Sequence, residues 1–238
     1  MSIRAVTFDC WSTLLYEPDP AASHARRVAA VAARTGVAES EARQALDTAW
    51  SYHLELWSAG IASGAAEMAR STLEQLGRAA SPAHAEALAH ALAEASLDAA
   101  VLPLEGALRT LEALAEAGVR RALICDTGFS PGRVVRRLLD RAGLLGLLEV
   151  HVFSDEAGVP KPHPRVFQQA LAPLAVAPSE ALHVGDLRRT DVAGARGAGL
   201  ASVRIRQHYD DRSGHPEADH VADTHAELLV WLRERVRG

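Results

Sequence analysis

Lysine is nearly missing from this chain of 238 residues. Among its 25 lysine and arginine residues, Lys161 is the only lysine. Because arginine supplies positive charge everywhere else, the single lysine indicates a place where a compact ammonium group fits and a flat guanidinium group does not. Pro160, Pro162 and Pro164 restrict the backbone of the loop around it. Lys161 is therefore a candidate functional residue.

Other absences exclude several classes of protein. Two cysteines, Cys10 and Cys125, cannot build a disulfide framework, and we expect both to be small buried side chains near strand ends. A formal net charge of −5 argues against nonspecific binding to nucleic acid or to an anionic membrane. No apolar run reaches the length of roughly 18 residues that a membrane span needs. The first residues show no signal-peptide pattern, so the sequence predicts a cytoplasmic protein.

The chain changes character twice along its length. Residues 3–8 form a predicted strand, and residues 21–98 are helical in pattern with breaks near Gly36, Gly60–Gly64 and Ser81–Pro82. After Pro103, predicted strands alternate with predicted helices. The predicted strands are 119–125, 150–153, 181–185, 201–205 and 219–222, and the predicted helices are 105–117, one starting at Ser130-Pro131, 164–173, one ending near Gly199, and 224–236.

This alternation predicts the fold class. Strands that alternate with helices form a parallel sheet with helices on both faces. We expect an α/β protein: a Rossmann-like three-layer core with a parallel sheet, plus an inserted all-helical domain, because the helical block is too long for a crossover. The predicted core comprises residues 1–15 and 102–238, and the predicted helical domain comprises residues 16–101.

Polar side chains follow four of the predicted strands. Ligands of open parallel sheets bind at the carboxyl ends of the strands, so these side chains are candidates for one shared site. Carboxylate oxygens are the ligands that Mg²⁺ prefers, and a lysine neutralises a substrate anion. The four segments are Asp9 through Thr13, Cys125-Asp126-Thr127-Gly128, the Lys161 loop, and Gly185-Asp186 with Asp191.

With these motifs in this order, the chain resembles the haloacid dehalogenase superfamily of hydrolases over its whole length. The helical insertion is similar to that family's helical, C1-type cap, which lies between the first and second motifs. The resemblance implies that Asp9 is the nucleophile of an aspartyl intermediate. It also implies a Mg²⁺ site made by Asp9, the backbone carbonyl of Trp11 and Asp186, with Asp191 supporting the water shell of the metal.

The resemblance also assigns the remaining roles. Lys161 would pair with Asp9 and with a small anionic, phosphorylated substrate. Thr13 would hydrogen-bond the backbone near the nucleophile and belongs to the substrate-binding candidates, together with Trp11, Gly128, Tyr16 and His53. Nucleic acid and membranes are not expected as partners, and the chain is expected to be a monomer or a homodimer.

Two positions depart from the family pattern. The family's phosphatases carry a second aspartate two residues after the nucleophile as general acid and base, and here that residue is Trp11. An indole does not exchange a proton at neutral pH, so a phosphatase of this kind should be slow, since general acid–base catalysis is worth roughly 10²–10⁴-fold. The serine or threonine of the second motif aligns with Cys125, a poor donor. Thr127 can take that role instead, and the sequence leaves both catalytic candidates open.

Three functions are therefore weighed. The first is Mg²⁺-dependent hydrolysis of a phosphomonoester. The second is a metal-independent 2-haloacid dehalogenase, since that branch also has an aromatic residue at the position of Trp11 and a halide leaves without an acid. Asp186 argues against this branch, which lacks the first acid of the Gly-Asp motif. The third is a weakly catalytic or non-catalytic protein that binds a ligand or a partner.

One helix face in the insertion carries aromatic residues. Trp50, His53 and Trp57 recur at positions i, i+3 and i+7 and therefore share a face. This face either lines the substrate cavity or forms the apolar seam between helices of the inserted domain, and the sequence does not decide between the two. Tyr16 lies at the predicted hinge between the two domains.

Overall fold

The computed structural model describes residues 3–78 and 80–236. Residues 1–2 and 237–238 of the predicted core, and residue 79 of the predicted helical domain, lie outside this description. By the packing of its residues, the chain forms two compact units. The first consists of residues 1–16, 102–126 and 139–238, and the second of residues 17–101 and 127–138.

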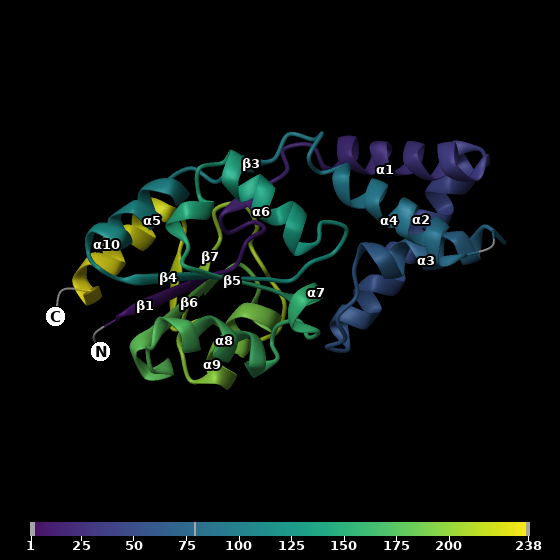
Figure 1. Cartoon of the computed structure of the whole chain (residues 1–238). Helices are drawn as coiled ribbons and strands as arrows, with labels where there is room; N and C mark the ends of the chain where they lie inside the picture. The colour runs from purple at the N-terminus through teal and green to yellow at the C-terminus, as the bar shows by residue number, and fades with distance from the viewer. Residues whose placement is uncertain (1–2, 79, 237–238) are drawn as a thin grey trace. The chain divides into compact units, whose positions relative to one another are not determined.

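A six-stranded parallel sheet lies at the centre of the first unit (Figure 1). It pairs strands that are far apart in the sequence: β1 lies between β4 and β6, and every pair is parallel. In sheet order, the strands are β5 (Val150–Phe153), β4 (Arg120–Cys125), β1 (Ala5–Phe8), β6 (Ala181–Gly185), β7 (Ala201–Ile205) and β8 (His220–Ala222).

Helices cover both faces of this sheet, as the alternating pattern predicts. Helices α5 (Ala107–Glu116) and α10 (His225–Val236) lie on one side, and α8 (Pro164–Leu171) and α9 (Ala193–Ala198) lie on the other (Figure 1). The fold class is therefore confirmed as a three-layer α/β core with an inserted helical domain. Among the described residues, no helix is both long enough and apolar enough to cross a bilayer.

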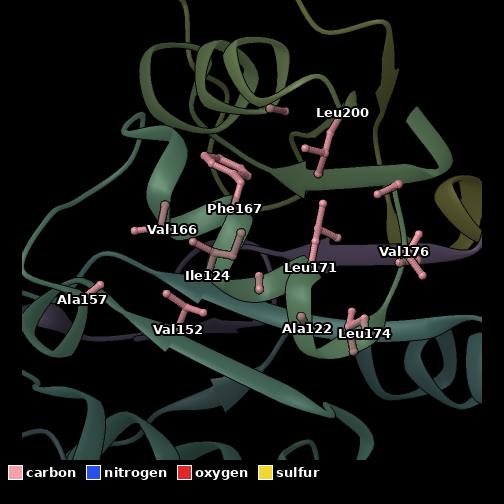
Figure 2. Close-up of a cluster of buried hydrophobic side chains, with 14 residues drawn as sticks. Ala122, Ile124, Val152, Ala157, Val166, Phe167, Leu171, Leu174, Val176 and Leu200 are labelled. Carbon is pink, nitrogen blue, oxygen red and sulfur yellow. The ribbon is translucent and has the colours of Figure 1, made fainter. Parts of the chain in front are cut away.

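The core between the sheet and α8 is apolar and closely packed. Figure 2 shows Phe167 and Leu171 of α8 lying over Ala122 and Ile124 of β4, with Leu200 beside them. All five side chains are less than 7% exposed. Burial of this kind stabilises a fold by roughly 25 cal/mol per Å² of apolar surface. This packing holds β4 in place against α8, and the polar candidate residues follow the carboxyl ends of β4 and its neighbouring strands.

The second unit is built from four helices. They are α1 (Pro20–Thr35), α2 (Glu39–Ser58), α3 (Ala65–Gln75) and α4 (Pro82–Glu94). The breaks predicted from sequence have local causes: the side chain of Asp19 caps α1, Gly36 ends it with a φ of 71°, and Ser81 caps α4 ahead of a proline.

Residues 127–138, which the sequence-based boundaries put in the core, pack within this second unit. Phe129 belongs to the unit's apolar cluster with Leu46, Met68 and Leu92. Helix α6 (Gly132–Arg141) then runs on into the first unit. The loop after β4 is thus attached to the helical unit by its side chains.

A two-stranded antiparallel sheet was not predicted. It pairs β2 (Leu15–Tyr16) with β3 (Leu102–Pro103), at the two points where the chain leaves and re-enters the first unit. Each strand has only two residues, too few to produce an alternating pattern in the sequence. A four-residue helix, α7 (Ser154–Ala157), follows β5 directly.

Candidate active site

The acidic candidates lie at the carboxyl ends of adjacent strands. Asp9 directly follows β1, and its backbone N–H donates to the carbonyl of Val184, which continues the pairing of β1 with β6. Asp186 directly follows β6. Because β1 and β6 are neighbours in the sheet, their carboxyl ends bring these two carboxylates together.

Lys161 lies between two carboxylates. Its Nζ donates to Oδ1 of Asp9 at 2.5 Å and to Oδ1 of Asp191 at 2.6 Å, and its side chain is 2% exposed. Its backbone N–H donates to Oδ1 of Asp126 at 2.9 Å, which attaches the lysine loop to the end of β4. The sequence prediction that Lys161 meets Asp9 is thus matched by a direct ion pair.

Asp191 is held by three donors. Its Oδ1 accepts from Lys161 and contacts Nε2 of His183 at 3.1 Å, and its Oδ2 accepts from the backbone N–H of Leu187 at 2.9 Å. The carboxylate lies directly over Gly185, where a Cβ would be 2.3 Å from Cγ of Asp191. Only glycine leaves enough room at position 185 for this carboxylate.

The three carboxylates form a candidate metal site. Asp9, Asp186 and Asp191 are all buried and offer oxygen atoms that lie within 4.8 Å of one another. One ammonium group cannot balance three carboxylates, so ionising all three without a further cation would leave excess negative charge in a buried site. Hard divalent cations take oxygen ligands of this kind, so the donor set fits Mg²⁺.

The pKa values reflect this crowding. Burial raises the pKa of Asp9 to about 7, against the opposing attraction of Lys161, and Asp191 adds repulsion. Burial and then repulsion from Asp9 and Asp191 raise the pKa of Asp186 well above its ordinary value. Burial opposes ionisation of Asp191 too, but Lys161 and the bond to His183 outweigh it and lower the pKa of that carboxyl.

Lys161 stays charged in this environment. Burial alone would lower the pKa of its ammonium group, but attraction by Asp191 and Asp9 outweighs burial and raises that pKa well above the ordinary value. A fixed positive charge thus lies beside one oxygen of Asp9. It is suited to neutralise an anion that approaches the nucleophile.

The turn after Asp9 is tight. Ser12 has a φ of 60°, in the left-handed region that few residues other than glycine adopt, and the carbonyl of Cys10 accepts from the N–H groups of Leu14 and Leu15. Trp11 is partly exposed on this turn. For Thr13 the predicted backbone bond is wrong: its Oγ1 is buried without a hydrogen-bond partner.

The two cysteines are neighbours at the ends of β1 and β4. Both are buried, and the thiol of Cys125 contacts Cys10 and donates to the carbonyl of Asp126 at 3.5 Å. The Cys10 contact and burial together raise the pKa of the Cys125 thiol well above its ordinary value. A neutral, buried thiol is a poor nucleophile and a poor target for oxidants.

The remaining substrate-binding candidates fall in the two units separately. Thr127, Gly128 and His53 belong to the helical unit, where Nδ1 of His53 lies 2.6 Å from Oγ of Ser63 and its ring stacks on Trp50 at 4.9 Å. A Cβ at Gly128 would be 3.1 Å from the Trp50 ring and 3.3 Å from Nε2 of His53. The aromatic face of α2 therefore packs against the loop after β4.

Tyr16 belongs to the first unit. It is the last residue of that unit before the chain enters the helical insertion. Its ring packs on His208 at 4.9 Å, and Nδ1 of His208 lies 3.1 Å from Oγ of Ser12. The turn after the nucleophile is thus supported from the loop that follows β7.

Sequence analysis missed His183. This residue is 1% exposed and lies on β6 two positions before Gly185, with Thr7 of β1 directly beside it in register. Its signal in the sequence was a single polar residue in an otherwise apolar, buried strand. A histidine in such a strand needs partners for both ring nitrogens, and the structure supplies them.

Comparisons with known proteins agree with this architecture. A family model described as haloacid dehalogenase-like hydrolase matches residues 3–199. The chain is 37% identical over 120 residues to a glyceraldehyde 3-phosphate phosphatase of Methanopyrus kandleri, an alignment that covers 46% of this chain and 52% of the relative. It is 43% identical over 82 residues to a phosphoserine phosphatase of Thermus thermophilus, covering 34% and 31%. The matched parts therefore span about half or less of these relatives.

Solved structures resemble the chain over nearly its whole length. A HAD phosphatase from Thermococcus onnurineus has a TM-score of 0.67 at 24% identity and covers 97% of this chain and 98% of its own. An L-2-haloacid dehalogenase from Xanthobacter autotrophicus has a TM-score of 0.63 at 19% identity and covers 97% and 98%. At these identities the likeness shows a shared fold. With the family model matching most of its length, the chain belongs to the haloacid dehalogenase-like hydrolases.

Proposed function

We propose that this chain hydrolyses the phosphomonoester of a small metabolite, with Asp9 as nucleophile and Mg²⁺ as cofactor. The observation that carries the proposal is the buried cluster of Asp9, Asp186 and Asp191 around the ammonium group of Lys161. Such a cluster, once it holds a cation, suits the transfer of an anionic group such as a phosphoryl group. The relatives of Methanopyrus kandleri and Thermus thermophilus named above, and a pyrimidine 5'-nucleotidase of Escherichia coli, are named for small phosphorylated substrates, which supports the choice of substrate class.

The first step is a displacement at phosphorus. A carboxylate oxygen of Asp9 attacks the phosphorus atom, the bond from phosphorus to the ester oxygen breaks, and the ester oxygen leaves as an alkoxide with the bonding electrons and takes a proton from solvent. The product on the protein is an aspartyl phosphate, a mixed anhydride. In the second step, water breaks that anhydride, gives inorganic phosphate and restores the carboxylate.

Other residues prepare this displacement. Lys161 holds one oxygen of Asp9 at 2.5 Å and would offer its charge to the phosphoryl oxygens. Asp9, Asp186 and the backbone carbonyl of Trp11 would hold the metal, with Asp191 behind them. When bound, Mg²⁺ supplies positive charge that keeps the carboxylates ionised and draws electron density from the phosphoryl group.

Proton transfer is the weak point of this site. Trp11 occupies the position from which the family's phosphatases protonate the leaving group. We infer that the enzyme works best on esters whose alcohol leaves readily as an anion. For other esters, the missing acid should cost roughly 10²–10⁴-fold in rate.

The helical unit is proposed as the cap over this site. In this role it would contribute His53 and Gly128 to substrate binding, together with either Thr127 or Cys125 at the end of β4. Thr127 is the better donor for a substrate, because a hydroxyl donates a stronger hydrogen bond than the thiol of Cys125.

A metal-independent 2-haloacid dehalogenase is the second candidate. It is favoured by Trp11, because a halide needs no acid to leave. Asp186 speaks against it, since this carboxylate is buried beside Asp9 and needs a cation to be ionised there. The two functions differ in their need for metal and can be separated directly.

The test uses the full chain in parallel assays. Hydrolysis of p-nitrophenyl phosphate is measured with MgCl₂ and with EDTA, and chloride release from 2-chloropropionate is measured with EDTA. We expect phosphatase activity that needs Mg²⁺ and is lost in Asp9→Asn but kept in Asp140→Asn, a control at an exposed position of α6. Metal-free chloride release would support the dehalogenase instead, and silence in both assays would indicate a binding protein.

A further inference from the structure

His183 connects the sheet to the site through its two ring nitrogens. Nδ1 lies 2.8 Å from Oγ1 of Thr7, and Nε2 lies 3.1 Å from Oδ1 of Asp191. The edge of Phe167 packs against the ring at 5.1 Å with an interplanar angle of 82°. These three contacts fix the ring between β1, α8 and the turn that carries Asp191.

The contacts determine where the proton of the ring lies. The Asp191 carboxylate only accepts hydrogen bonds, so Nε2 of His183 must be the donor. Oδ1 of Asp191 already accepts from the Lys161 ammonium group, and a second cation on the same oxygen atom would be repelled. In the neutral ring, a proton on Nε2 leaves Nδ1 as an acceptor.

Thr7 fixes this tautomer. Its hydroxyl has one proton and two neighbouring acceptors, Nδ1 of His183 at 2.8 Å and the carbonyl of Leu182 at 3.3 Å. The shorter contact favours donation to Nδ1. A hydroxyl that donates to Nδ1 keeps the ring proton on Nε2, where it faces Asp191.

We propose that His183 is a positioning residue, set by Thr7, that holds the Asp191 carboxylate in the orientation from which it aligns Lys161 with Asp9. This inference rests on the proposed function only for its kinetic consequences. Supporting residues that orient the ligands of a metal or a catalytic group typically contribute 10- to 100-fold in affinity or activity. We expect a loss of that size in kcat/KM when the Nε2 donor is removed.

Gly185 makes the arrangement possible. It lies two positions after His183 on the same strand, and its missing side chain leaves the space that Asp191 fills. The Asp191 carboxylate thus packs against β6, with Gly185 beneath it and the His183 donor at its side. In this proposal, β6 orients Asp191 through His183 and Gly185 in addition to pairing with its neighbours in the sheet.

The kinetic test compares two variants at position 183, two at position 7 and one double variant. His183→Phe keeps a ring of similar size without a donor, and His183→Gln keeps a donor where Nε2 lies. We expect His183→Phe to lose roughly 10- to 100-fold in kcat/KM, mainly in kcat, and His183→Gln to recover most of it. Thr7→Val should show a smaller loss, Thr7→Ser almost none, and Thr7→Val should add nothing to His183→Phe.

A control separates positioning from simple destabilisation. His220→Phe changes a histidine on β8 that stacks on Trp231, away from the carboxylates, and should leave kinetics unchanged. Equal losses in His183→Phe and His183→Gln, or additive losses in the double variant with Thr7→Val, would overturn the proposal.

An independent readout needs no activity at all. Nitrogen-15 NMR of histidine-labelled protein, with His183 assigned by its absence in His183→Gln, reports which ring nitrogen carries the proton. We expect the Nε2–H form in the wild type and a mixture in Thr7→Val. An Nδ1–H form or an imidazolium in the wild type would refute the inference. If the wild type hydrolyses no phosphomonoester, the proposed function fails while this spectrum still decides the role of Thr7.

Discussion

Replacement of Asp9 by asparagine should remove activity and stabilise the metal-free protein. Burial raises the pKa of Asp9 from 3.8 to about 7 in the folded chain. A carboxyl whose folded pKa is raised binds its proton more tightly when folded, so the stability that it contributes falls as pH rises from about 4 through about 7. The asparagine side chain has no such titration.

The magnitude follows from the shift. At 1.36 kcal/mol per pKa unit, ionised Asp9 costs about 4 kcal/mol at pH 8, and this cost shrinks below about 1 kcal/mol at pH 4. The same repulsion is shared with Asp186, so about 4 kcal/mol is a ceiling for Asp9 alone. At roughly 2–4 °C per kcal/mol, this ceiling corresponds to a melting temperature of Asp9→Asn about 8–16 °C above that of the wild type at pH 8.

Calorimetric scans in EDTA from pH 4 to pH 8 provide the assay. The difference in melting temperature between Asp9→Asn and the wild type should widen with pH, and Asp140→Asn should follow the wild type throughout. Saturating MgCl₂ should narrow the gap, because a bound cation removes the cost of ionised Asp9. A gap that stays constant with pH would show that the buried charge is not the source of instability, and the electrostatic account of the site would be refuted.

Three further predictions concern single positions. Trp11→Asp should raise the phosphatase rate by supplying the missing acid, while Trp11→Asn should not; equal rates would mean that proton transfer is not the deficit. Lys161→Arg should lose nearly as much kcat as Lys161→Met, because a 2% exposed ammonium group with bonds of 2.5 and 2.6 Å leaves no room for a guanidinium fork, and substantial activity in the arginine variant would contradict this. Gly185→Ala should displace Asp191, since its Cβ would lie 2.3 Å from Cγ, and should lower both kcat and thermal stability; unchanged kinetics would show that this carboxylate is free to move.

The fold could be predicted largely because its signals are local. The strand predicted at 181–185 matches β6 residue for residue, and the helix breaks at Gly36 and Ser81–Pro82 have capping chemistry that is visible in the sequence. The pairing of β2 with β3 could not be predicted from the sequence, because it joins two dipeptides that are far apart in the chain. Pairing at such distance leaves no periodic pattern.

The candidate site was predictable only where residue type limits the chemistry. Asp9, Lys161 and Asp186 follow strands and carry charges that need partners, so their convergence could be inferred from topology. The role of His183 could not, because a histidine in a strand has many satisfactory partners until the neighbouring strand is known. The unpaired hydroxyl of Thr13 likewise depends on the shape of one tight turn.

The single lysine also allows opening of the candidate site to be measured by chemical labelling. Among the side chains, Lys161 alone offers a primary amine, and in the folded chain it is 2% exposed. An acylating dye should therefore modify this side chain only when the loop around it opens, so that the labelling rate measures the opening of the site. Inorganic phosphate with magnesium should slow that labelling if both bind there, and peptide mapping at residue 161 would read it out.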